Sequence, residues 1–121
     1  MLRNRVGGMM LACSLLMSGS AFAAGAIAVD DEAGTKAGDV GYGVGYGDSR
    51  EEAAKQALSE CRKAGNSKCE VVVRYDTCGA YAVSANYSGS GWGSSEDAAK
   101  EKALEACGNA SCRVVVSDCD N

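Results

Sequence analysis

Six cysteines are the residues of this chain with the widest chemical scope, because a cysteine can bind zinc as a thiolate, attack as a nucleophile or form a disulfide. They are Cys61, Cys69, Cys78, Cys107, Cys112 and Cys119, and a seventh, Cys13, stands in the N-terminal segment. An even number of cysteines in a short exported chain is typical of a disulfide scaffold. Since the N-terminus described below indicates export, we expect three disulfides and no metal site.

An internal repeat narrows the fifteen connectivities that six cysteines permit. Residues 49–61 are echoed by residues 95–107, and residues 69–73 by residues 112–116. Equivalent positions should pair equivalently, which predicts the disulfides Cys61–Cys69 and Cys107–Cys112. Cys78 and Cys119 then remain, and we expect them to pair with each other across the repeats.

Carboxylates are the remaining candidates for catalysis. The chain has no histidine, and so it lacks the commonest general base and metal ligand. The candidate acids are Asp30, Asp31, Glu32, Asp118 and Asp120. A glycosidase-like site needs two carboxylates that face each other across a cleft, and an enzyme of this kind would use Asp30, Asp31 or Asp118. The simpler interpretation of residues 30–32 is an acidic turn in solvent.

Aromatic side chains are the best candidates for binding. Five of them concentrate on predicted strands and turns: Tyr42, Tyr46, Tyr81, Tyr87 and Trp92. Some must fill the core, because the predicted helices are rich in alanine. Any exposed subset would form a rigid amphipathic patch of the kind that anchors protein interfaces. Both roles are open for each residue on sequence grounds.

The elements that position these residues recur in the order strand, strand, helix, strand. The pattern predicts strands at 26–29, 40–46, 71–75, 81–86, 90–93 and 114–117. Ser49 with Glu52, and Ser94 with Asp97, form capping boxes that begin two helices. The glycine-rich run 41–47 lacks the Lys-Ser/Thr of a phosphate loop, and indicates a strand packed closely against another element.

These elements predict an α+β fold. We expect a two-layer domain in which one antiparallel sheet carries both helices on one face, with residues 76–79 forming a hairpin between strands 71–75 and 81–86. The apolar faces of the helices are rich in alanine, and Leu58 and Leu104 are expected to anchor them on the sheet. The repeats would span about 25–78 and 79–119 of a single domain.

The N-terminus predicts a signal peptide over residues 1–23, which leaves residues 24–121 as the mature domain. Arg3 and Arg5 precede an apolar stretch, and Ala21-Phe22-Ala23 fits a signal-peptidase site. The stretch is too short and glycine-broken for a stable membrane span. Lipidation of Cys13 is the rival interpretation, disfavoured by Met10 at the first position of the lipobox. We therefore expect a periplasmic or secreted protein.

The net charge of the chain indicates which class of partner it could bind. Without Arg3 and Arg5, ten basic residues face sixteen acidic ones, so the predicted mature chain has a net charge of −6. The basic residues form no stripe, and binding to nucleic-acid phosphates needs one. The acidic balance favours solubility or a basic partner over nucleic acid.

A motif that includes an aromatic residue, glycine and serine occurs twice before a predicted helix. Tyr46-Gly47-Asp48-Ser49 precedes an alanine-rich helix ending at Cys61, and Trp92-Gly93-Ser94-Ser95 precedes one ending at Cys107. This doubled motif resembles the small exported bacterial proteins grouped as domain of unknown function 4189. This resemblance implies an α+β domain, an exported location and no established catalytic residues. A looser architectural similarity links tandem repeats of this kind to secreted β-lactamase inhibitory proteins, whose concave sheets bind enzymes.

The leading functional hypothesis is a non-enzymatic, exported protein-binding domain without a cofactor. Its partner would be a protein, such as an envelope or cell-wall enzyme that the domain inhibits or against which it confers immunity. The alternatives are a small envelope hydrolase that uses carboxylates, and a secreted effector. We expect binding residues where the repeats differ, at 30–41, at 62–64 and on the Trp92 side of the second repeat.

Overall fold

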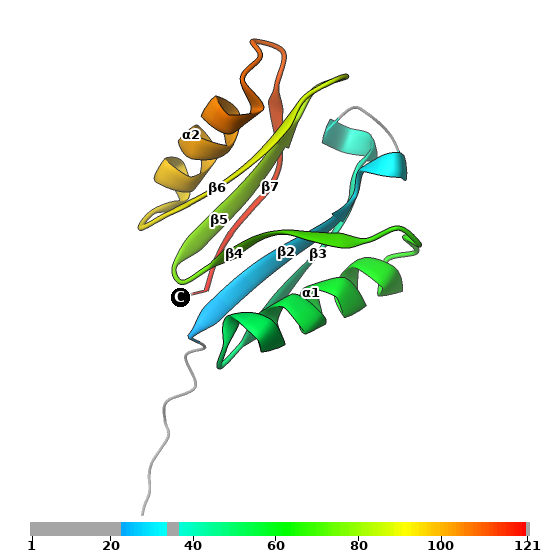
Figure 1. The fold of residues 1–121 in the computed structure, drawn as a ribbon, viewed down its shortest axis with the longest axis vertical. Coiled ribbons are helices and arrows are strands. Elements are labelled where there is room, and N and C mark those ends of the chain that lie inside the picture. Colours follow the sequence, from blue (N-terminus) through cyan, green and yellow to red (C-terminus); the bar gives the residue numbers. More distant parts are fainter. Residues whose placement is uncertain (1–22, 34–36, 121) are drawn as a thin grey trace, which may run out of the picture.

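Two units with the same order of elements make up the described chain, residues 23–33 and 37–120 of a computed structural model (Figure 1). The first contains β2 (Ala24–Asp30), β3 (Gly41–Gly47), α1 (Arg50–Lys63) and β4 (Glu70–Tyr75). The second contains β5 (Cys78–Val83), β6 (Ser88–Gly93), α2 (Glu96–Cys107) and β7 (Arg113–Cys119). Two short 3-10 helices, η1 (Asp31–Ala33) and η2 (Ala37–Asp39), lie between β2 and β3.

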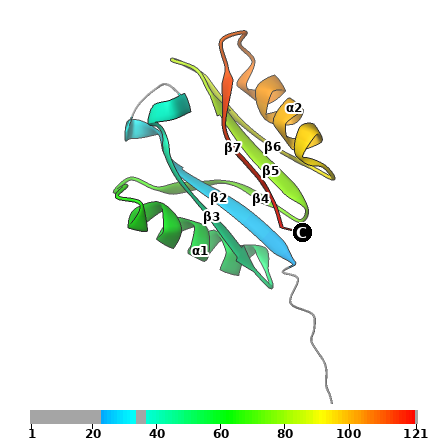
Figure 2. The ribbon, with the colours of Figure 1, turned by 180° about the vertical axis from the view of Figure 1, so that it is seen from behind.

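The strands form two antiparallel sheets rather than one. Their orders are β3-β2-β4 and β6-β5-β7. The sheets lie against each other, with α1 on the outer face of the first and α2 on the outer face of the second (Figures 1 and 2). The predicted α+β class and antiparallel pairing are confirmed. The predicted single sheet with both helices on one face is wrong, because the helices cover opposite outer faces of four layers.

The central strands explain this arrangement, because each is buried along its whole length. In β2, Ala26 and Ala28 pack towards α1, whereas Ile27 and Val29 point into the other sheet. The same alternation of small and large residues occurs in β5. A strand that is apolar on both faces must be covered on both. A single sheet with helices on one face would have left the Ile27 side in water.

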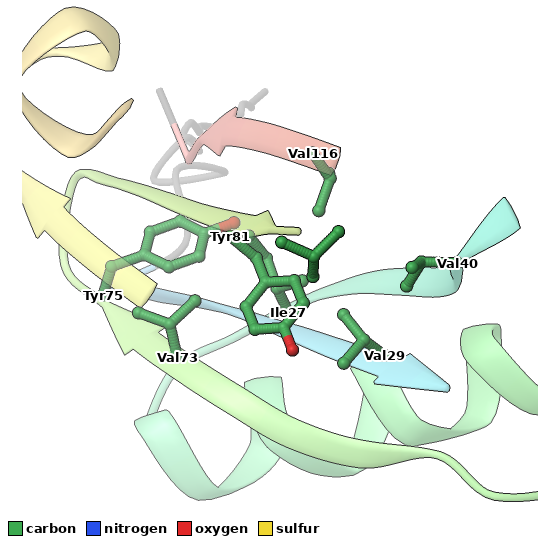
Figure 3. Packing of buried hydrophobic residues seen from close by; sticks show 8 residues of the cluster. Ile27, Val29, Val40, Val73, Tyr75, Tyr81 and Val116 are labelled. Atoms are coloured by element: carbon green, nitrogen blue, oxygen red, sulfur yellow. The ribbon is translucent and has the colours of Figure 1, made fainter. Parts of the chain in front are cut away.

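The core between the sheets consists of bulky apolar side chains (Figure 3). Its buried members are Ile27, Val29, Val40, Val73, Tyr75, Tyr81, Val83 and Val116. Because β4 and β5 belong to different sheets, residues 76–77 carry the chain from one sheet to the other. The predicted hairpin between these two strands is therefore wrong.

Glycines on the edge strands β3 and β6 let the helices lie directly on the sheets. A Cβ atom on Gly45 would overlap the backbone of α1 at Ala57, and one on Gly91 would approach the backbone of α2 at Ala103. This confirms the prediction of close packing for residues 41–47. The helix faces in contact with the sheets are consequently alanine and cysteine, and Leu104 is 38% exposed instead of anchoring α2.

Serine caps begin both helices. The Ser49 hydroxyl accepts a hydrogen bond from the Glu52 N–H at 3.2 Å, as the capping box predicts. In the second helix the cap is Ser95, which accepts from the Ala98 N–H at 3.1 Å. The predicted cap, Ser94, is one residue too early.

Three disulfides connect these elements, and their pairs are those that the repeat predicts. Cys61–Cys69 and Cys107–Cys112 each join the last turn of a helix to the approach to the following strand. Cys78–Cys119 joins β5 to β7 at directly opposite positions of one sheet. This third bridge was expected to cross between the repeats. It lies within the second unit, because the boundary between the units falls before Cys78.

Candidate functional site

One carboxylate joins the two units at the end of the sandwich where β4 ends. Asp118, on β7, accepts hydrogen bonds at Oδ2 from the hydroxyl of Tyr46 at 2.5 Å and from that of Tyr75 at 2.9 Å. Tyr46 lies on β3 and Tyr75 on β4. The ring of Tyr75 is fully buried between Gly25 and Gly79, where an added Cβ atom would overlap it.

Both phenols in this cluster are held in the neutral form. Desolvation raises the pKa of Tyr46 and of Tyr75 far above the ordinary value, and the hydrogen bond and negative charge of Asp118 raise both further. A phenolate is therefore disfavoured near neutral pH, so neither hydroxyl has the charge of an activated nucleophile. The three side chains therefore form a hydrogen-bonded connection between the two sheets.

A second tyrosine–aspartate pair lies at the opposite end of the sandwich. The Tyr81 hydroxyl donates to Oδ2 of Asp31 at 3.1 Å, and burial is the main cause that raises the pKa of Tyr81. Beside this pair is a hollow of about 250 Å³, which Asp31 lines together with the β5–β6 connection and Tyr87.

The remaining acidic candidates do not form a catalytic pair. Asp30 is 5% exposed and accepts from the N–H groups of Glu32 and Lys68, each at 3.1 Å, so the expected solvated turn is wrong for this residue. Asp118 is bonded to Tyr75, which pairs with Gly25 near the beginning of β2. Asp30 is the last residue of β2. Five residues of strand separate the two ends by about 17 Å. Asp30 and Asp118 therefore do not face each other across one cleft.

No cluster of metal-binding side chains was found in the described ranges. All six cysteines there are in disulfides, and residues 23–33 and 37–120 contain no group of three His, Cys, Asp or Glu side chains placed to hold an ion. The thiolates that zinc would need are consumed by the bridges.

The five aromatic candidates do not form one patch. Tyr81 is buried in the core and Tyr46 is partly buried against Asp118. The exposed subset is Tyr42 at 45%, Tyr87 at 53% and Trp92 at 60%. Tyr42 lies on β3, Tyr87 in the β5–β6 connection, and Trp92 near the far end of β6, about 17 Å along the strand from Tyr87.

Trp92 lies beside an open groove, which we call the Trp92 groove. The groove has a volume of about 330 Å³ and is lined by Val71, Val72, Val73, Arg74 and Trp92. It follows β4, an edge strand of the first sheet, and Trp92 comes from β6, an edge strand of the second. The Arg74 side chain is exposed and makes no ion pair or hydrogen bond with other described residues.

Sequence reasoning did not single out Tyr75 or Arg74. A signal for Tyr75 was present, because aligning Cys69 with Cys112 places Tyr75 opposite Asp118. The same repeat makes Gly25 equivalent to Gly79, the two glycines that enclose the Tyr75 ring. Nothing in the sequence marks Arg74, because its place in the groove wall depends on how the two sheets pack.

The family model for a domain of unknown function (DUF4189) matches residues 24–119, which include the strands, the two α-helices and the three disulfides of the described residues. The chain belongs to this family. Searches of curated proteins and of solved structures find no match for this DUF4189 domain.

Two further observations describe the surface of the DUF4189 domain. No helix within residues 23–33 and 37–120 is long and apolar enough to cross a membrane. The inner faces of both sheets are buried against each other, so they do not present the open concave sheet of the β-lactamase inhibitory proteins. The predicted signal peptide, apart from Ala23, and Cys13 lie outside the described residues.

Proposed function

We propose that this chain is an exported protein-binding domain without catalytic activity, and that its partner binds at the Trp92 groove. The observation that carries the proposal is the 60% exposure of Trp92, a large aromatic side chain beside a hollow and the most exposed of the large apolar side chains in the described residues. Tryptophan is among the residues that most often dominate binding energy at protein interfaces.

The rest of the molecule supports a scaffold rather than an enzyme. The phenols at Asp118 are neutral, the cysteines are in disulfides, and Asp30 and Asp118 lie at opposite ends of a strand. These positions give little support to a hydrolase that pairs carboxylates. A rigid frame also lowers the entropy that an interface loses on binding.

Three disulfides in a domain of this size fit an oxidising compartment. Together with the predicted signal peptide, they support a location in the periplasm or outside the cell. The partner is then a protein of that compartment, and an envelope or cell-wall enzyme that the domain inhibits or neutralises is the class we propose.

Site-specific photo-crosslinking tests this proposal. The full chain would carry benzoylphenylalanine at position 92 in the producing cell, and a matched control would carry it at position 42, which is also exposed but lies on β3. We expect one defined protein adduct from position 92 and none from position 42. No adduct from position 92, or the same adducts from both, would contradict the proposal.

A further inference from the structure

The two sides of the sandwich differ in how they are covered, although the units share one plan. On the side of β3 and β7, Tyr46 is bonded to Asp118 and η2 packs against β7. Both η helices belong to the long β2–β3 connection, and its last residue, Val40, enters the core. The β5–β6 connection is only residues 84–87, closed by a 2.8 Å bond from the Ser84 N–H to the Tyr87 carbonyl. The β5–β6 connection therefore adds no helix over β4, and on this side of the sandwich β4 lies against β6 itself.

The outer edge of β4, the side turned away from β2, is unpaired within the described chain. β4 is the last strand of its sheet, and none of its residues makes a backbone hydrogen bond beyond its ladder with β2. An edge of this kind is a template for an additional strand. The register shift at Val72 does not set β4 apart, because the second sheet has the corresponding shift in β7.

We propose that an extended, acidic segment of the partner protein adds as a strand to the outer edge of β4. This rests on the proposed function and names the chemistry of its partner. Main-chain hydrogen bonds to an edge strand supply affinity, and alternate side chains supply specificity. An apolar side chain of the segment packs on Trp92, and a carboxylate pairs with Arg74.

Charge and length identify this occupant. Arg74 is a cation in the groove wall that has no partner among the described residues, and an acidic residue of the segment would pair with it. The groove wall contains four consecutive residues of β4, which corresponds to a paired stretch of about 13 Å. A short strand of about four residues fits this length.

The experiment uses Trp92 as its reporter, because it is the single tryptophan of the chain. The probe is a capped hexapeptide, Thr-Val-Glu-Val-Thr-Val, titrated while Trp92 fluorescence is followed. Hydrogen exchange of the amides of residues 70–75 is measured with and without the peptide. We expect a saturable fluorescence change together with slower exchange in β4.

Two control peptides separate the backbone contribution from the charge contribution. Replacing the second of the probe's three valines, at position 4 of the peptide, by proline removes a main-chain donor. This change should abolish the slower hydrogen exchange of β4. Replacing glutamate by lysine should weaken binding by about three- to fivefold, as expected for an exposed ion pair. Arg74→Gln should remove this preference for glutamate, whereas Arg62→Gln, on the exposed end of α1, should leave it unchanged.

Several outcomes would overturn strand addition. One is a fluorescence change without protection of β4, and another is equal binding of the glutamate and lysine peptides. Protection of β4 that appears without peptide, with dimerisation in sedimentation, would assign the edge to a second copy.

The crosslinking experiment separates this inference from the proposed function. An adduct at position 92 combined with an unprotected β4 would refute strand addition alone. Peptide binding without any adduct in the cell would refute the proposed function alone.

Discussion

The hydroxyl of Tyr75 donates a 2.9 Å hydrogen bond to Asp118, and the two residues occupy equivalent positions of the two repeats. Each is at or near the end of the last strand of its unit. Two aspartates in these places would repel each other, whereas a phenol and a carboxylate are complementary. The units therefore differ in sequence at a point where they meet.

Removing the Tyr75 hydroxyl should weaken this connection. Tyr75→Phe deletes one donor to Asp118 and leaves the donor from Tyr46, so we expect a loss of about 1–2 kcal/mol in the free energy of unfolding. Urea denaturation without reductant measures it. Tyr42→Phe is the matched control, since that side chain is exposed. Equal midpoints for the two variants would show that the bond contributes nothing.

Stability should fall at alkaline pH through the same cluster. Burial and Asp118 raise the folded-state pKa of Tyr46 and Tyr75 above the ordinary value of 10.0. The unfolded chain loses these protons first, so the contribution is complete below about pH 10 and declines as pH rises above it. Urea midpoints between pH 8 and 11 measure the slope. The double variant Tyr46→Phe/Tyr75→Phe should have a shallower decline, and an unchanged slope would contradict this assignment.

The three disulfides should differ in how much they contribute to the free energy of unfolding. Cys78–Cys119 spans 41 residues and Cys107–Cys112 spans 5. In the loop-closure description, replacing the first pair by alanines costs about 4 kcal/mol and replacing the second about 2 kcal/mol. Comparing the two double variants by thermal unfolding tests this order. A larger loss from the short bridge would mean that native packing, not loop closure, controls the difference.

The contact between α1 and β3 should not tolerate a methyl group. Gly45→Ala places a Cβ atom into the helix backbone at Ala57, and we expect a loss of about 2–3 kcal/mol. Gly38→Ala is the control, because no atom lies within 4 Å of its added Cβ. Thermal unfolding of the two variants provides the measurement. A neutral Gly45→Ala would show that α1 can move away from the sheet at no cost.

Local patterns predicted most of the elements. Ser49 and Glu52 mark the beginning of α1, as the capping box predicted. The short disulfides followed from the equivalent positions of their cysteines in the sequence repeat. The prediction that Leu104 anchors α2 was wrong. The glycines of β6 bring α2 so near the sheet that only small residues fit in the contact.

The sequence by itself determined what depends on near neighbours: the helices, most of the strands, the two short disulfides and the alternation of Ala and bulky residues in β2 and β5. The strand predicted at 81–86 was placed three residues too late, because β5 is Cys78–Val83. Only the tertiary structure decided what covers the second apolar face of each central strand, that Tyr75 meets Asp118, and that the outer edge of β4 stays unpaired beside Trp92 in the described chain. Alternation shows that a face is apolar, but it does not specify the distant segment that buries it. That choice depends on how the two units pack and on the unequal lengths of their connections.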